Sequence, residues 1–120
     1  MANRVLVISW GTPVRGREER GLEVFDEAMG LFGRMQESGR IESFAVVLLA
    51  PNAELNGYIE LHGSAEQIAA LRRDEEFERN TAQAALVVDG LRHTEGLTDD
   101  EIARQMALYR EALAGVPQAA

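Results

Sequence analysis

Hydrophobic positions in the first half of the chain change spacing in a way that predicts a strand, a helix and two further strands. Residues 4–10 hold a dense apolar run that stops at a Gly-Thr-Pro cluster, which predicts a strand buried on both faces. Residues 17–38 carry two adjacent apolar stripes at helical spacing, and we therefore expect a long helix with a wide apolar face. Residues 41–50 are mostly apolar and residues 55–62 alternate, which predicts the second and third strands.

The second half of the chain predicts a broken helix, a strand and a final helix. Ser64 and Gln67 have the spacing of a capping box, so a helix is expected to begin there, bend or break near Asp74, and continue to residue 83. Residues 86–93 predict the fourth strand because they contain another apolar run. A second capping-box pattern, formed by a threonine and a glutamate, predicts a C-terminal helix over residues 98–114.

The resulting order is β-α-β-β-α-β-α, which is the order of the split βαβ, or ferredoxin-like, fold with one extra helix. We expect an α+β protein with an antiparallel sheet of strand order 4-1-3-2 and both crossover helices on one face. No linker or low-complexity segment divides the chain, so residues 1–120 are predicted to form a single domain with the helix at 98–114 appended.

Strand parity decides which side chains cover the open face of this sheet. Ile59 and Leu61 alternate with polar residues and are therefore assigned to the face beneath the helices. The open face is assigned Leu6, Ile8, Trp10, Tyr58, Glu60, His62, Val87, Asp89, Leu91 and His93, and the helix side is assigned Val5, Val7, Leu86 and Val88. An open face this apolar needs a cover, so we expect a homodimer in which two sheets pack face to face about a two-fold axis.

Composition and charge narrow the classes of function. The chain has no cysteine, which excludes disulfides, thiolate metal sites and cysteine nucleophiles. The net charge is −8 and all basic residues are arginine, so nucleic acid is not an expected partner and lysine Schiff-base chemistry is excluded. No segment has the length of a membrane span or the pattern of a secretory leader, and we therefore expect a cytoplasmic protein with no membrane partner.

Three short stretches resemble a known superfamily. They are Ile41-Glu42-Ser43-Phe44, Leu55-Asn56-Gly57-Tyr58 and residues 71–77 (LRRDEEF). Together with the order of elements, they resemble the dimeric α+β-barrel superfamily, and most of all its uncharacterised bacterial members. That superfamily includes small antibiotic-biosynthesis-type monooxygenases, haem-degrading enzymes and muconolactone isomerases. The resemblance implies a fold and a dimer more than an activity, because one scaffold carries unrelated functions there.

The candidate catalytic residues are two histidines and two acids. Arg4, His62 and His93 are expected to gather at one mouth of the barrel, with Glu60 and Asp89 further in, where an imidazole beside a carboxylate can act as a general base. The alternative is structural: Arg4 pairs with Asp89 or Glu60 and the histidines line the rim. No metal site is expected, because the histidines lie on non-adjacent strands, about 10 Å apart.

Trp10 and Tyr58 are the candidate ligand-binding aromatics, together with His62 and Arg4. Trp10 and Tyr58 are expected at the other end of the open face from His62 and Arg4, where they can grip a flat ligand with a polar contact from Asn56 or Arg15. The alternative is that Trp10 is a core or dimer contact. Haem-degrading members of the superfamily place Asn, Trp and His in their pocket, but the residues here do not match that motif in order or position.

Three functions stay open at this point. The leading one is a homodimer that binds a small apolar or aromatic molecule in the barrel without a cofactor. The second is a cofactor-free monooxygenase or isomerase that uses His62 or His93 with Glu60 or Asp89. The third is a non-catalytic structural or interaction module whose barrel is filled by side chains. Whether the chain is an enzyme is left undecided, and every site assignment depends on the parity of the strands.

Overall fold

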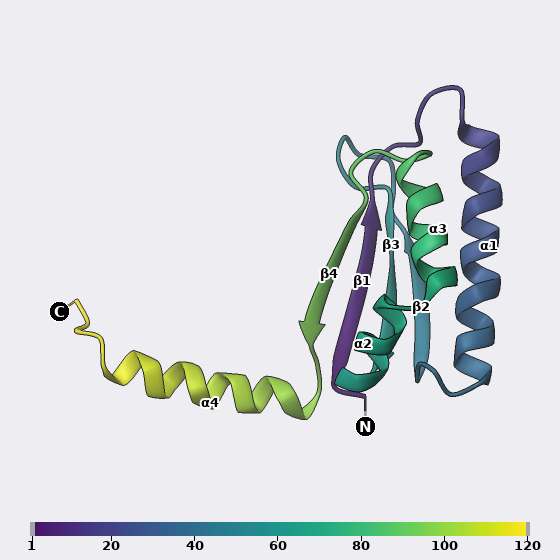
Figure 1. Ribbon diagram of the computed structural model, residues 1–120. Helices are drawn as coiled ribbons and strands as arrows, with labels where there is room; N and C mark the ends of the chain where they lie inside the picture. The colour runs from purple at the N-terminus through teal and green to yellow at the C-terminus, as the bar shows by residue number, and fades with distance from the viewer. Residues whose placement is uncertain (1, 120) are drawn as a thin grey trace.

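The computed structural model describes residues 2–119 and contains one four-stranded sheet with three helices on one side and a fourth that projects away (Figure 1). The elements are β1 (Arg4–Trp10), α1 (Glu18–Glu37), β2 (Ser43–Leu48), β3 (Gly57–Gly63), α2 (Ala65–Arg72), α3 (Glu75–Ala85), β4 (Arg92–Leu97) and α4 (Asp100–Ala114). No helix within residues 2–119 combines the length and the apolar character needed to cross a membrane.

The sheet confirms the predicted fold class. Its order is β2-β3-β1-β4, which is the predicted order 4-1-3-2 counted from the opposite edge, and all neighbouring strands are antiparallel. Helices α1, α2 and α3 cover a single face, as expected for a ferredoxin-like unit (Figure 1). The core lies between these helices and the sheet.

The predicted helix break is confirmed, and local hydrogen bonds explain it. The Ser64 side chain accepts a hydrogen bond from the Gln67 amide, and the Gln67 side chain accepts one from Ser64, so the predicted capping box starts α2. Asp74 then caps a separate helix, α3, by accepting a hydrogen bond from the backbone amide of Phe77 at 3.0 Å. The chain turns at Asp74 because its side chain competes with the helical backbone for that donor.

The predicted second capping box is wrong. The residue that precedes α4 is Asp99, at a φ of 54°, and its side chain makes no cap bond. The hydroxyl of Thr98 is buried and has no hydrogen-bond partner within residues 2–119. Glu101 turns instead toward the body of the molecule, where its carboxylate lies 3.7 Å from the Arg4 guanidinium.

The predicted bounds of the fourth strand are also wrong, since β4 covers Arg92–Leu97 and not residues 86–93. The apolar run that suggested a strand forms a buried connection, in which Val87 is 4% exposed and packs beside Gly21 of α1. Gly90 then turns the chain at a φ of 65°. The true strand is polar because it lies at the edge of the sheet, where fewer of its side chains are covered.

The parity predicted for β1 is wrong, whereas that of β3 is confirmed. Ile59 and Leu61 lie in the core beneath the helices, as expected. Leu6 pairs with Leu61 and Ile8 pairs with Ile59, and residues directly opposite in an antiparallel ladder share a face. The helix side therefore carries Leu6, Ile8 and Trp10 of β1, together with Leu91 and His93.

The open face carries the alternate residues of each strand. They are Val5, Val7 and Ser9 of β1, Tyr58, Glu60 and His62 of β3, Ser43, Ala45 and Val47 of β2, and Arg92, Thr94 and Gly96 of β4.

Candidate functional site

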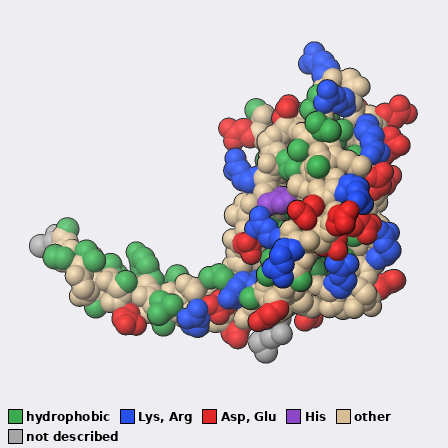
Figure 2. Space-filling view, viewed as in Figure 1, with side chains coloured by type: hydrophobic (Ala, Val, Ile, Leu, Met, Phe, Trp, Pro, Cys, Tyr) green, Lys and Arg blue, Asp and Glu red, His purple; other side chains and the backbone are tan. Residues whose placement is uncertain are grey.

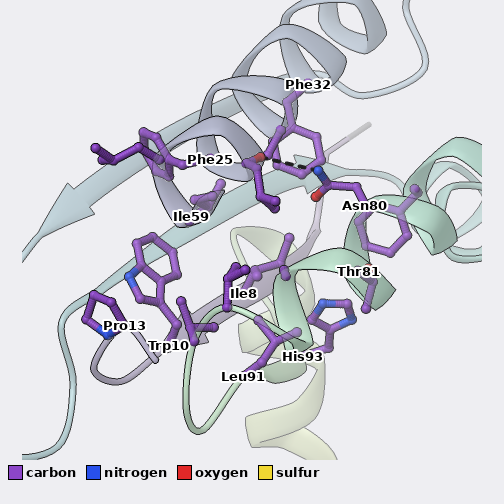
Figure 3. A pocket seen from close by; sticks show the side chains of 18 of the residues that line it. Ile8, Trp10, Pro13, Phe25, Phe32, Ile59, Asn80, Thr81, Leu91 and His93 are labelled. Carbon is purple, nitrogen blue, oxygen red and sulfur yellow. Dashed lines mark hydrogen bonds between the residues drawn. The ribbon is translucent and has the colours of Figure 1, made fainter. Parts of the chain in front are cut away.

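A cavity of about 260 Å³ lies between the sheet and helices α1 and α3 (Figure 3). The floor is formed by the helix face of the sheet, and the walls are formed by α1, α3 and the connection before β4. The residues that line the cavity include Ile8, Trp10, Phe25, Leu22, Leu48, Ile59, Phe77, Asn80, Thr81, Ala84, Leu91 and His93. Most of them are apolar, so the cavity suits a molecule with little charge.

Aromatic rings shape one side of the cavity. The Trp10 and Phe25 rings meet edge to face with centroids 6.0 Å apart, which is a favourable geometry for such a pair. Gly57 makes this position of the indole possible, because a Cβ atom there would lie 2.8 Å from Cζ2 of Trp10. The sequence therefore positions Trp10 with a glycine on the paired strand.

His93 is the titratable side chain at the other end of the aromatic wall. Its ring packs against Phe77 with centroids 5.4 Å apart, and no hydrogen bond joins the ring nitrogens to another group within residues 2–119. Burial lowers the pKa of His93 below its ordinary value of 6.5, and the nearby positive charge of Arg72 lowers it further. At neutral pH the cavity therefore contains a neutral imidazole with both ring nitrogens available to a ligand.

Asn80 and Thr81 of α3 add neutral polar groups to the cavity (Figure 3). The Asn80 amide donates a long hydrogen bond of 3.4 Å to the backbone carbonyl of Val24 on α1. Asn80 and Thr81 follow Phe77 by three and four residues, so all three lie on the same side of the helix. Sequence reasoning missed Asn80 and Thr81, although this spacing from an apolar anchor is a signal that identifies them.

The predicted gathering of polar groups at one mouth of a barrel is not found. His93 pairs with Ile8 on the helix face, whereas His62 lies on the open face. There His62 Nε2 and Glu60 Oε1 are 2.9 Å apart, and both side chains are half-buried. The structure thus brings His62 together with Glu60 but separates both of them from His93.

Arg4 and Asp89 lie apart from both histidines. Arg4 pairs with Glu101, so the alternative prediction that it pairs with Asp89 or Glu60 is wrong. Asp89 is exposed in the connection before β4, where its carboxylate accepts a hydrogen bond of 3.4 Å from the Thr12 hydroxyl. Neither side chain lines the cavity.

The two aromatic candidates separate in the same way. Tyr58 pairs with Ser9 on the open face, while Trp10 lies over Gly57 on the helix face, so they do not grip one ligand. Asn56 is held by backbone hydrogen bonds, and neither it nor Arg15 lines the cavity. Of the predicted site residues, Trp10 and His93 therefore line the same cavity. The asparagine in that cavity is Asn80, and not the predicted Asn56.

Within residues 2–119, no three histidine, aspartate or glutamate side chains lie close enough to hold a metal ion. The cavity supplies a single imidazole and neutral polar groups, with Glu18 near its rim. Its chemistry is therefore that of a neutral base in an apolar environment.

Comparison with known proteins finds solved structures with a similar fold. No protein-family model matches the chain, and no curated protein matches it at the required significance. Among solved structures, the chain is similar to a dimeric protein of unknown function and ferredoxin-like fold from Bacteroides fragilis, with a TM-score of 0.58 and 12% identity over 78% of this chain and 95% of that one. It is also similar to a conserved protein from Methanosarcina mazei, with a TM-score of 0.61 and 10% identity over 81% and 94% of the two chains.

A third similar structure is SnoaB, a cofactor-independent oxygenase from Streptomyces nogalater, with a TM-score of 0.50 and 16% identity over 82% of this chain and 93% of that one. At these identities the similarity is one of fold. It confirms the predicted ferredoxin-like fold, and the activity of this chain has to be argued from its own cavity.

Proposed function

We propose that this protein binds a small, flat, mostly apolar molecule in the cavity between the helix face of the sheet and helices α1 and α3. The observation that carries the proposal is a cavity of about 260 Å³ that is lined by core residues, among them Ile8, Phe32 and Ile59. Such a space forfeits contacts between side chains unless a ligand restores them. A lining of apolar side chains with a few neutral polar groups is typical of small-molecule sites.

The lining defines the chemical class of the ligand. The cavity volume of about 260 Å³ is slightly below the roughly 300–1,000 Å³ usual for small-molecule pockets, which favours a molecule of about two or three fused rings. Trp10 and Phe25 offer ring edges and faces, and His93 offers a neutral nitrogen that can accept a hydrogen bond. A phenol or a quinone has both an aromatic ring for these contacts and an oxygen for a hydrogen bond. A strongly charged ligand would find no side chain of opposite charge deep in the cavity.

The homodimer expected from the sequence remains part of the proposal, with different contact residues. The apolar part of the open face includes Val7, Val47 and Tyr58, which are partly exposed, and a second copy packed on this face would bury them. The similar Bacteroides fragilis protein is dimeric, which supports this arrangement. The expectation of no nucleic-acid partner rests on the net charge of −8, and the cytoplasmic location stays a prediction.

Fluorescence of Trp10 tests ligand binding directly, because it is the single tryptophan of the chain and it lines the cavity. Titration with 1-naphthol or a naphthoquinone is expected to change its emission in a saturable way. Ala84→Leu fills the cavity from α3 and should abolish the change, whereas Ala82→Leu, at an exposed position of the same helix, should leave it intact. Absence of a saturable signal, or equal binding by the two variants, would contradict the proposal.

A second candidate function is cofactor-independent oxygenation, and the observation that favours it is the neutral His93 in an apolar cavity. Such a base can take a proton from an activated CH₂ or phenol group and leave an electron-rich anion that reduces O₂. The overall change converts CH₂ and O₂ to a carbonyl and one water. The similar Streptomyces nogalater protein is a cofactor-independent oxygenase, which supports the reaction class.

Oxygen uptake with anthrone as the probe substrate tests the second function. The wild-type chain is expected to consume O₂ above the uncatalysed rate, and His93→Gln is expected to lose most of this activity while still binding naphthol. Activity should be constant above about pH 6.5 and fall in more acidic solution, because protonation removes the base. If His93→Gln retains full activity, His93 is not the base.

A further inference from the structure

Helix α4 leaves the body of the molecule as an arm (Figure 1). It extends past the β4 edge of the sheet, away from helices α1–α3, and nearly every residue from Ile102 onward is exposed. The radius of gyration is 17.3 Å, compared with about 14 Å for a compact chain of this length. The molecule is therefore elongated because α4 projects from it, and the side chains of α4 are left uncovered.

The first turn of the arm is fixed to the sheet. Thr98 donates a backbone hydrogen bond of 3.0 Å to Asn3, and only two residues separate the end of β4 from α4. Glu101 is 8% exposed and lies beside Arg4, 3.7 Å away, while Arg104 donates a hydrogen bond of 2.9 Å to it. The direction in which the arm projects is therefore held by specific contacts at its root.

The exposed arm carries a narrow apolar seam. Ile102, Met106, Tyr109 and Leu113 follow one another at steps of four, three and four residues, which is the spacing of helices that pack against another surface as in coiled coils. These four side chains are 40–63% exposed, and Figure 2 shows apolar side chains along the arm. An isolated helix of this length is marginal in water, so the seam needs a partner.

The body offers a matching apolar surface at the mouth of the cavity. Outside α4, the exposed large apolar side chains within residues 2–119 are Leu22, Leu48, Leu86, Leu97 and Val116, the last of which follows the end of α4. Leu22 and Leu48 are 67% and 69% exposed, and both line the cavity. One wall of the cavity is therefore made of side chains that face solvent, which leaves the proposed binding site incomplete.

A chain cannot easily place its own arm on its own cavity mouth. Leu48 and Trp10 lie at one end of the sheet, where both pair with Gly57, whereas α4 starts beside Arg4 and Leu97 at the other end. The fixed root also directs the arm away from α1. A lipid surface is disfavoured as well, because α4 carries three acidic and two basic side chains and lacks a basic face.

We propose that α4 of one copy packs its seam over Leu22 and Leu48 of a second copy and closes the mouth of that copy's cavity. A two-fold axis diagonal to the strands brings the corner of one sheet where α4 starts, at the β4 edge, to the corner of the other sheet where Leu48 lies, at the β2 edge. The exchange covers the exposed leucines and the seam together. This inference deepens the proposed binding function, since it adds residues of the partner to the site.

Disulfide cross-linking tests the exchange in the full-length chain, which has no cysteine of its own. Met106→Cys and Leu48→Cys chains, carrying different affinity tags, are co-expressed and oxidised. A disulfide requires Cα atoms within about 7 Å, so its formation reports close contact. We expect a covalent pair containing one chain of each tag. Ala107→Cys, about 100° around α4 from Met106 and outside the seam, is the matched control and should not link to Leu48→Cys.

Each outcome of this experiment decides the question. Selective linkage of Met106→Cys supports the exchange, and failure to link, or equal linkage by Ala107→Cys, overturns it in favour of a different cover for α4. Naphthol titration of the wild-type chain keeps the two proposals apart. Ligand binding without linkage refutes the arm alone, and linkage without ligand binding refutes the binding function alone.

Discussion

The two faces of the sheet differ in how completely their side chains are covered. On the helix face, Leu6 and Leu61 are fully buried, and the same face encloses the cavity with Trp10 and His93. On the open face, the His62–Glu60 pair remains partly exposed. The difference shows that a chemically interesting pair of side chains is not sufficient for a site. An enclosed space is also needed, because water otherwise screens the polar groups.

The largest expected difference between the faces concerns stability. Leu61→Ala, beneath the helices, should lower the free energy of unfolding by roughly 2–5 kcal/mol, because it removes buried contacts and leaves a void. Its neighbour Glu60 lies on the open face, and Glu60→Ala should cost only about 0.5 kcal/mol. Urea denaturation of both variants measures the contrast. Similar losses would mean that the two faces are equally packed.

A smaller loss of stability is expected when the cap of α3, one of the helices that cover the helix face, is removed. Asp74 caps α3, which carries Asn80 and Thr81 into the cavity, and hydrogen bonds from Arg40 and the Phe77 amide lower the pKa of Asp74. Asp74→Ala should therefore reduce stability by about 1 kcal/mol. Its contribution is present above about pH 3.8 and is lost as the pH falls through the lower pKa of the folded state. Thermal unfolding at neutral and acidic pH checks both statements, and a loss that does not shrink in acid would contradict them.

The two histidines provide a matched comparison of the faces for ligand binding. His93→Gln should weaken the binding of naphthol by up to about tenfold, which corresponds to the loss of one hydrogen bond of roughly 0.5–1.5 kcal/mol. His62→Gln should leave the affinity unchanged, because His62 lies on the other side of the sheet. Calorimetric titration measures both affinities. A larger loss from the His62 variant would place the ligand on the open face.

The smallest expected effect is a dependence of stability on pH through His93. Its pKa in the folded state lies below 6.5, so between these values the unfolded chain binds a proton that the folded chain does not. The stability that neutral His93 contributes is therefore full above about pH 6.5 and decreases as the pH falls. His93→Phe should flatten this part of the stability curve in urea titrations. An unchanged slope would show that His93 does not carry the effect.

Much of the architecture is predictable from the sequence, because helical spacing and capping residues act locally. The break at Asp74 and the first strand follow from such signals, and the strand order follows from the sequence of elements. The parity of β1 does not, since residues 5–8 are apolar on both faces. It is fixed only by the register that pairs Leu6 with Leu61, and register depends on contacts between distant segments.

The same limit explains which site residues could be found. Trp10 and His93 were identified as candidates from their residue types, but they were placed on the open face, where no such cavity forms. The run at residues 86–91 has the composition of a strand, but it forms a connection in which Val87 is buried. The fourth strand therefore begins later than predicted, at Arg92, and His93 lies near its start and not at its end. Tertiary packing overrides local propensity in this segment.

Neighbouring residues of β1 offer the most direct test of where a ligand binds. Ile8 faces the cavity, and Val7, one position earlier, faces the open side of the sheet. Nuclear Overhauser contacts between bound 1-naphthol and the methyl groups of these two residues therefore distinguish the faces within one strand. We predict strong contacts to Ile8 and none to Val7. Contacts to Val7 without contacts to Ile8 would contradict the assignment of the cavity as the binding site.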